Sequence, residues 1–174
     1  MYFGKYLNKL MMLNIVGFNL AWFGLVYWGN IFIPFSLLLL GAHLYFIAKS
    51  PSELWLILSI TVIGVFIDSL LQFSTLFIFT NSSHIPFWLM VLWACFAATI
   101  CHSLRFLEKS KLLQILVGGL FAPLSYIAGY QLQVVSFSLS PLITYLILSL
   151  IWGLLLVLFF VLKEKLVSSE VSYV

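Results

Sequence analysis

Charged residues are scarce in this sequence. Only 7% of its 174 residues are Asp, Glu, Lys or Arg, whereas 64% are hydrophobic. A soluble domain of average composition has about 25% charged residues, which cover most of its surface. A folded chain with so few charges needs lipid rather than water around most of its surface. The composition therefore predicts an integral membrane protein and excludes a soluble fold.

Cysteine is also rare, and long polar segments are missing. The two cysteines, Cys95 and Cys101, lie six residues apart within one apolar stretch. On a helix this spacing separates them by about 9 Å, which is too far for a disulfide. The spacing is also not that of a metal-binding or redox pair, so we expect buried free thiols. Because no polar stretch is long enough for a linker, residues 1–174 are expected to form a single transmembrane domain.

Six apolar blocks make up most of the chain, and each is about as long as a membrane-spanning helix. The predicted spans are residues 10–28, 31–48, 54–79, 86–104, 112–132 and 141–162. The predicted fold class is an all-α membrane protein, a bundle of six transmembrane helices. Lys5 and Lys9 precede the first block, as in a secretory signal, but no small-residue cleavage site follows it. We therefore expect this block to be retained as a span.

The basic residues fall on one side of the predicted bundle. The three connections on the other side, around Asn30, Asn81 and Val134, contain no Lys or Arg. Because Lys and Arg are enriched on the cytoplasmic side of membranes, we expect both termini in the cytoplasm (N-in/C-in). Nucleic acid is not an expected partner, since these residues form no continuous patch. The eight residues are Lys5, Lys9, Lys49, Arg105, Lys109, Lys111, Lys163 and Lys165.

Asp68 is the one acidic residue that lies deep inside a predicted span. An Asp at the membrane centre costs about 2.5–3.5 kcal/mol, so its side chain is expected to face the interior of the bundle. It shares a helix face with Thr61, Gly64, Gln72 and Thr75, and Gln72 is placed to form a hydrogen bond with it. Two interpretations stay open: a polar stripe that holds helices together, and a ligand- or proton-binding site.

Three further polar residues lie at similar depths near the cytoplasmic ends of their spans. Asn14, His43 and His102 belong to the first, second and fourth spans, and they predict an inner polar layer beneath Asp68. Two histidines and an acid suit a metal ion in principle, but their spacing matches no metal-binding motif. We therefore expect no metal. Hydrogen-bonded packing, contact with lipid headgroups and acid–base chemistry stay open for this layer.

The fifth span contains an unusual run that leads from Gly118-Gly119 through Pro123 to Tyr130. A proline inside a helix removes a backbone donor and predicts a kink. Beyond Pro123, the helix presents Tyr126 and Tyr130 at the depth of Asp68. A kinked, glycine-rich helix beside a buried acid suits the wall of a small cavity between the third and fifth spans. The candidate ligand-binding residues are Asp68, Gln72, Tyr126, Tyr130 and Trp22.

Several short motifs together resemble a known family. They are Asn14…Trp22, His43, Gly64…Asp68, Pro86-x-Trp88…Leu92-Trp93…Phe96-Ala97 and Pro123-Leu-Ser-Tyr126-x-x-Gly129. In this order they are similar to domain of unknown function 2878, a family of small bacterial inner-membrane proteins, over nearly the whole chain. The segment after Gly129 departs from the family's small-residue pattern. Since genes of this family lie near enzymes that modify fatty acids, the resemblance implies a role in lipid modification or handling, with membrane lipids and a lipid-modifying enzyme as partners.

These observations leave three functions open. The favoured one is an accessory protein that binds a lipid or another apolar small molecule, which fits the aromatic content of 18%. A small-solute or proton-coupled transporter, or its substrate-binding subunit, is the second, although the internal repeat of many transporters is missing. The third is an intramembrane lipid-modifying enzyme. No catalytic residues are assigned, because the sequence shows no paired acids, metal cluster or nucleophile motif. We expect no cofactor, and the oligomeric state stays open.

Overall fold

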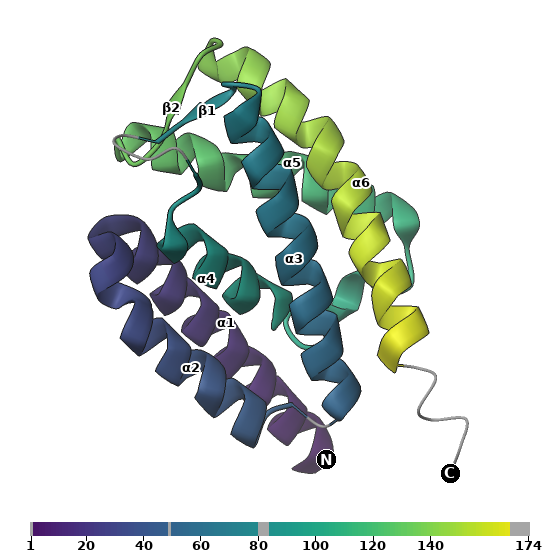
Figure 1. The fold of residues 1–174 in the computed structure, drawn as a ribbon. Coiled ribbons are helices and arrows are strands. Elements are labelled where there is room, and N and C mark those ends of the chain that lie inside the picture. The colour runs from purple at the N-terminus through teal and green to yellow at the C-terminus, as the bar shows by residue number, and fades with distance from the viewer. Residues whose placement is uncertain (1, 49, 80–83, 168–174) are drawn as a thin grey trace.

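A computed structural model of the chain describes the backbone of residues 2–48, 50–79 and 84–167, with side chains from residue 9 onward (Figure 1). The α-helices in these ranges are α1 (Tyr2–Trp28), α2 (Ile33–Phe46), α3 (Pro51–Phe73), α4 (Phe87–Ala97), α5 (Lys111–Gln131) and α6 (Pro141–Val167). Two short 3₁₀-helices are η1 (Gly29–Phe32) and η2 (Arg105–Leu107), and two short strands are β1 (Phe77–Ile78) and β2 (Ser136–Phe137). The chain is therefore almost entirely helical, in agreement with the predicted class.

Helix α3 runs through the middle of the molecule. It packs against α4 and against α6, while α4 also contacts α1 and α2, and α6 packs along α5. Figure 1 shows α1 and α2 on one side of α3 and α6 on the other. The buried apolar side chains form one continuous core that is contributed mainly by α3, α4 and α6.

The outer surface of the bundle is apolar. Four helical stretches are long and apolar enough to cross a membrane: Lys9–Phe46, Pro51–Phe73, Lys111–Gln131 and Pro141–Val167. Large apolar side chains on these stretches point outward, and Phe73 is 90% exposed. Exposure of such side chains to water would cost about 25 cal/mol for each Å² of apolar surface, whereas lipid removes that cost. The chain is therefore a multi-pass membrane protein.

The first of these stretches folds back on itself. Helix α1 ends at Trp28, and Gly29 adopts a left-handed conformation with φ of 58°, which glycine tolerates without steric cost. Helix α2 then returns along α1, and the two lie side by side (Figure 1). The connection predicted around Asn30 is thus confirmed.

Helices α3 and α4 are shorter than predicted. Helix α3 ends at Phe73 rather than at residue 79, because Thr75 is left-handed (φ 62°) and leads into β1. Thr75 therefore lies beyond the helix face that carries Asp68. Helix α4 ends at Ala97 rather than at residue 104, and hydrogen-bonded turns follow it. The hydroxyl of Thr99 donates to the Phe96 carbonyl at 2.6 Å, and this local bond favours a turn over continued helix.

The far ends of α3 and α5 are joined by the two short strands. Gln133, just beyond α5, is left-handed like Thr75 (φ 60°), and each helix then leads into a strand. The strands pair antiparallel, with Phe77 opposite Phe137. Because of this pairing, the ends of α3 and α5 are held close to each other, although α3 packs mainly on α4 and α6. Both cysteines are free, but only Cys95 is buried as predicted, whereas Cys101 is partly buried.

Helices α5 and α6 approach so closely that their backbones nearly touch. A Cβ atom added at Gly118 would lie 2.5 Å from the carbonyl oxygen of Trp152, and one added at Gly119 would lie 3.0 Å from that of Ser149. Small residues allow such contact between membrane helices, where packing rather than exclusion of water drives association. The glycine pair in the fifth span therefore serves helix packing. Pro123, one turn further on, is fully buried inside α5.

The Gly118→Ala variant is expected to lower the stability of the purified protein by about 1–3 kcal/mol, because the new methyl group would meet backbone that cannot yield without separating the helices. Gly41→Ala is the matched control, since nothing lies within 4 Å of a Cβ at that position. Thermal unfolding in detergent measures both. Equal melting temperatures for the two variants would contradict the close packing of α5 on α6.

Candidate functional site

Asp68 lies in the centre of the bundle and is fully buried. Its carboxylate accepts two hydrogen bonds, from the Trp93 indole Nε1 to Oδ2 at 2.7 Å and from the Tyr126 hydroxyl to Oδ1 at 3.0 Å. The three residues come from α3, α4 and α5 respectively. A buried acid with two donors satisfies the requirement that polar groups inside a membrane protein find partners. Asp68 therefore ties three helices together at one point.

Both donors of Asp68 are held in place by their neighbours. The Trp93 ring lies against Gly64, where even a Cβ atom would overlap it, and it stacks on Trp152 with centroids 5.0 Å apart and planes 4° apart. The Tyr126 ring stacks on Phe77 at 5.2 Å. Gly64 and Asp68 lie one turn apart on the same face of α3. The missing side chain at Gly64 leaves room for the Trp93 ring, and the N–H of this ring donates to Asp68.

An apolar cavity of about 470 Å³ lies on the other side of these two donors. Residues of α1, α4 and α5 form most of its walls, and Trp93 and Tyr126 belong to them. Asp68 is behind this wall rather than in it. Three wall residues, Phe23, Phe121 and Leu124, are 61%, 64% and 49% exposed, so the cavity reaches the outer surface of the bundle.

The five predicted ligand-binding residues do not share one site in the structure. Trp22 and Tyr126 line the cavity. Asp68 lies behind the wall, where it accepts hydrogen bonds from the wall residues Tyr126 and Trp93. Gln72 lies one turn beyond Asp68 on α3 and is partly buried. Tyr130 stacks on Phe137 at 4.9 Å, beside the strands. The cavity borders α5, as expected, but its facing walls are α1 and α4 instead of α3.

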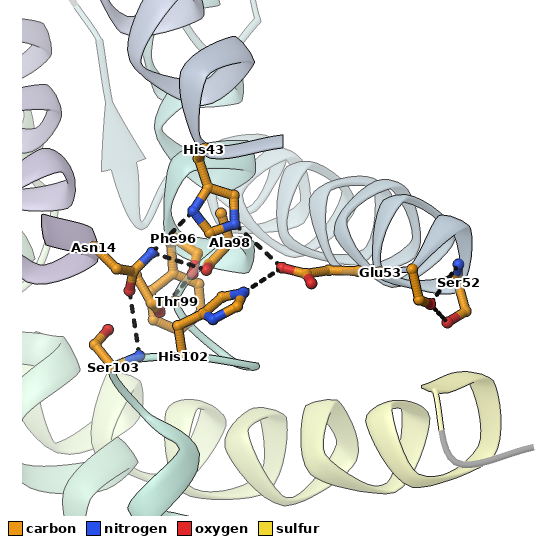
Figure 2. A network of polar contacts seen from close by, with 10 residues as sticks. Asn14, His43, Ser52, Glu53, Phe96, Ala98, Thr99, His102 and Ser103 are labelled. Carbon is orange, nitrogen blue, oxygen red and sulfur yellow. Dashed lines mark hydrogen bonds and ion pairs between the residues drawn. The ribbon is translucent and has the colours of Figure 1, made fainter. Parts of the chain in front are cut away.

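The predicted inner polar layer forms a second cluster, at the beginning of α3 (Figure 2). The Asn14 amide nitrogen lies 3.3 Å from His43 Nδ1, and the rings of His43 and His102 meet edge to face at 4.9 Å. Glu53 joins the three residues, since its Oε1 lies 3.1 Å from His43 Nε2 and 2.7 Å from His102 Nε2. The ligand atoms of His43, Glu53 and His102 all lie within 4.8 Å of one another, so this cluster is a candidate metal-binding group.

Glu53 is not among the predicted site residues, because it directly precedes the third predicted span, residues 54–79. The structure places it in the first turn of α3 with 5% of its surface exposed. The signal that would have found it is the run Ser50-Pro51-Ser52-Glu53, which matches the pattern of a helix start. Ser50 does cap α3, since its side chain accepts from the Ser52 backbone N–H. An acid at that position is thereby directed into the bundle, where histidines from two other segments surround it.

Asp68→Asn is expected to lower the stability of the protein by about 1–3 kcal/mol, because an amide has one acceptor oxygen and its nitrogen would face a donor. Glu164→Gln on the exposed face of α6 is the control that also removes one acidic charge. Chemical or thermal unfolding in detergent measures both variants. If Asp68→Asn is as stable as Glu164→Gln, the carboxylate does not hold the three helices together.

Comparison with known proteins gives one match. A family model described as protein of unknown function (DUF2878) matches residues 11–158, which include every residue of the two polar clusters and of the cavity wall. No curated protein and no solved structure matches the chain. The resemblance drawn from the short sequence motifs is therefore confirmed. The chain belongs to the DUF2878 family of proteins of unknown function.

Proposed function

We propose that this protein binds a lipid or another apolar small molecule in the cavity between α1, α4 and α5, as an accessory to membrane fatty-acid modification. The observation that carries the proposal is the cavity itself, which is apolar and opens onto the outer surface of a membrane protein. Its volume of about 470 Å³ falls within the range of small-molecule sites, about 300–1,000 Å³.

The chemistry of the wall favours an apolar ligand. Three of the wall residues carry an amide or a hydroxyl group, and each of these groups has a hydrogen-bond partner within the protein. The Asn19 amide donates to the Ile15 carbonyl, the Ser125 hydroxyl donates to the Ala122 carbonyl, and the Tyr126 hydroxyl donates to Asp68. Aromatic and aliphatic side chains supply most of the remainder. A ligand that enters would gain contact with apolar surface and would find few free polar groups.

Access from the bilayer follows from the position of the opening. Phe23 on α1 and Phe121 on α5 border the cavity and are also exposed on the outside of the bundle. Because lipid surrounds that surface, an acyl chain would reach the cavity sideways without crossing water. The role in fatty-acid modification, and a lipid-modifying enzyme as partner, are supported by what the family resemblance implies about neighbouring genes.

Co-purifying ligand tests the proposal directly. Native mass spectrometry of the protein in mild detergent is expected to show a bound lipid or apolar molecule. The Ala128→Phe variant should reduce the bound fraction several-fold, since Ala128 lines the cavity and the new ring would occupy it. Leu154→Phe, at a 72% exposed position of α6 outside the wall, is the matched control and should retain the ligand. Equal occupancy in both variants, with both folded, would place the ligand elsewhere.

The proposal includes six membrane spans with both termini in the cytoplasm of a bacterial inner membrane. The one-sided distribution of Lys and Arg supports this orientation. Figure 1 is consistent with it, because the start of α1, the start of α3 and the end of α6 lie at the same end of the molecule. Helices α2 and α4 have 14 and 11 residues and are therefore about 21 and 16 Å long, so they cross only with the help of the turns that flank them.

Reporter fusions test the orientation. A fluorescent protein fused after residue 174 should fold and fluoresce, because it would remain in the cytoplasm. Alkaline phosphatase inserted near residue 30 or residue 134 should be active, because these connections would face the opposite side. Phosphatase activity of a fusion after residue 174 would show that the number of spans or the orientation is different.

A further inference from the structure

A second cavity, of about 290 Å³, lies between α1, α2 and α4, beside the lipid cavity between α1, α4 and α5. Most of its wall is apolar. Its polar wall residues, Asn14 and His43, are already hydrogen-bonded within the cluster at the beginning of α3. Leu13 and Phe46 also belong to the wall and are 51% and 72% exposed, so the second cavity opens onto the outer surface as well. An apolar chain therefore suits this cavity better than a polar solute.

Phe18 on α1 belongs to the walls of both cavities. Its neighbours on α1 divide between them: Gly17 and Ala21 line the second cavity, whereas Asn19 and Trp22 line the lipid cavity. Because successive residues of a helix are about 100° apart, these two pairs lie on opposite sides of Phe18 around the helix axis. Phe18 is therefore located at the boundary between the two cavities.

The Phe18 side chain closes this boundary by packing on α4. Its ring meets the Phe96 ring edge to face, with centroids 6.2 Å apart. Phe96 lines the lipid cavity and the preceding residue, Cys95, lines the second cavity, so the boundary passes between them on α4. A phenyl ring forms no conventional hydrogen bond. A smaller side chain at position 18 would therefore join the two cavities without leaving a polar group unpaired.

Gly17 is independent evidence that the second cavity is open space. A Cβ atom added at Gly17 would have no atom of another residue near it within 4 Å. The glycines at helix contacts behave differently, since a Cβ atom at Gly64 or at Gly118 would collide with a neighbouring residue. Small residues in membrane helices usually allow two helices to approach closely. Gly17 instead leaves volume free in the wall of the second cavity.

The position of Phe18 suits contact with the far end of a ligand. Phe23 is exposed at the opening of the lipid cavity, and Phe18 lies about 7.5 Å nearer the beginning of α1. Few free polar groups line the cavity, and a polar headgroup is costly to bury without hydrogen bonds. The apolar end of a lipid therefore enters, while its headgroup stays outside. A chain that extends toward the beginning of α1 ends against the Phe18 ring.

We propose that Phe18 is a specificity-determining residue, which limits the length of the acyl chain that the lipid cavity accepts. A chain longer than this limit must displace the Phe18 ring from Phe96 before it reaches the second cavity. Wild-type protein therefore selects against such chains. This inference rests on the proposed function, because it concerns the ligand of the lipid cavity, and it names a single acyl chain as the ligand class.

Chain-length selection tests the role of Phe18. Saturated fatty acids of graded length are added to the protein in lipid nanodiscs, and native mass spectrometry gives the bound fraction for each length. Wild-type protein is expected to bind acids up to a limiting length. Phe18→Ala is expected to bind the acids beyond that limit several-fold better than wild type, and to bind the shorter acids like wild type. Phe18→Leu keeps more of the packing and should shift the limit in the same direction by less.

Two double variants test where the additional length is held. Phe18→Ala with Gly17→Leu should restore the wild-type limit, because the new leucine occupies the second cavity. Phe18→Ala with Gly41→Leu is the matched control and should keep the longer limit. Gly41 lies outside both walls, and a Cβ atom there also has nothing within 4 Å. Both variants replace a helical glycine by leucine, so they change helix propensity alike.

The outcomes distinguish this inference from the proposed function. If wild-type protein binds fatty acids and neither Phe18→Ala nor Phe18→Leu changes the limit, Phe18 does not determine chain length. If the longer limit persists in Phe18→Ala with Gly17→Leu, the chain does not extend into the second cavity. If wild-type protein binds no fatty acid of any length, or if Ala128→Phe binds them like wild type, the proposed function is wrong and this inference is overturned with it.

Discussion

Acidic side chains buried inside this bundle need hydrogen-bond partners within the protein, because lipid offers none. Asp68 shows how this constraint organises the fold. Its two carboxylate oxygens accept from residues on two other helices, Trp93 and Tyr126. Both donors are held by stacked aromatic rings, and both also form part of the cavity wall. One buried acid thus sets the relative position of three helices and the shape of the cavity beside them.

The cluster at the beginning of α3 meets the same constraint in a different way. Asp68 has two neutral partners, an indole from α4 and a phenol from α5. Glu53 has two imidazoles as partners, one from α2 and one from the turns that follow α4. Both arrangements connect separate segments of the chain through one buried acid. Asn14 connects α1 to this cluster, and its orientation is determined by backbone groups of the segment after α4.

Close helix contact in the bundle depends on residues without side chains. Gly118 and Gly119 allow the backbone of α5 to approach the backbone of α6, and Gly64 leaves room for the Trp93 indole. The glycines have different consequences: the pair in α5 joins two helices, whereas Gly64 places a hydrogen-bond donor next to Asp68. A cavity lies beside this dense packing, with α5 on one side and α1 and α4 as the facing walls.

Several features of this protein followed from the order of its residues. The scarcity of charge predicted a membrane protein, and the apolar blocks predicted where most helices lie. The depth of polar residues predicted that Tyr126 lies level with Asp68 and that Asn14, His43 and His102 share one layer. These inferences succeeded because helical spacing determines the face and depth of a residue, and both are local properties of the chain.

Other features required the three-dimensional arrangement. Helix spacing does not show which helices are neighbours, so Trp93 was not expected as a partner of Asp68, nor α1 and α4 as walls of the cavity. Glu53 looked like part of a connection, and only the crossing of four segments buries it between two histidines. Face and depth are encoded along one helix, whereas the partner of a buried polar group is settled only when separate helices pack.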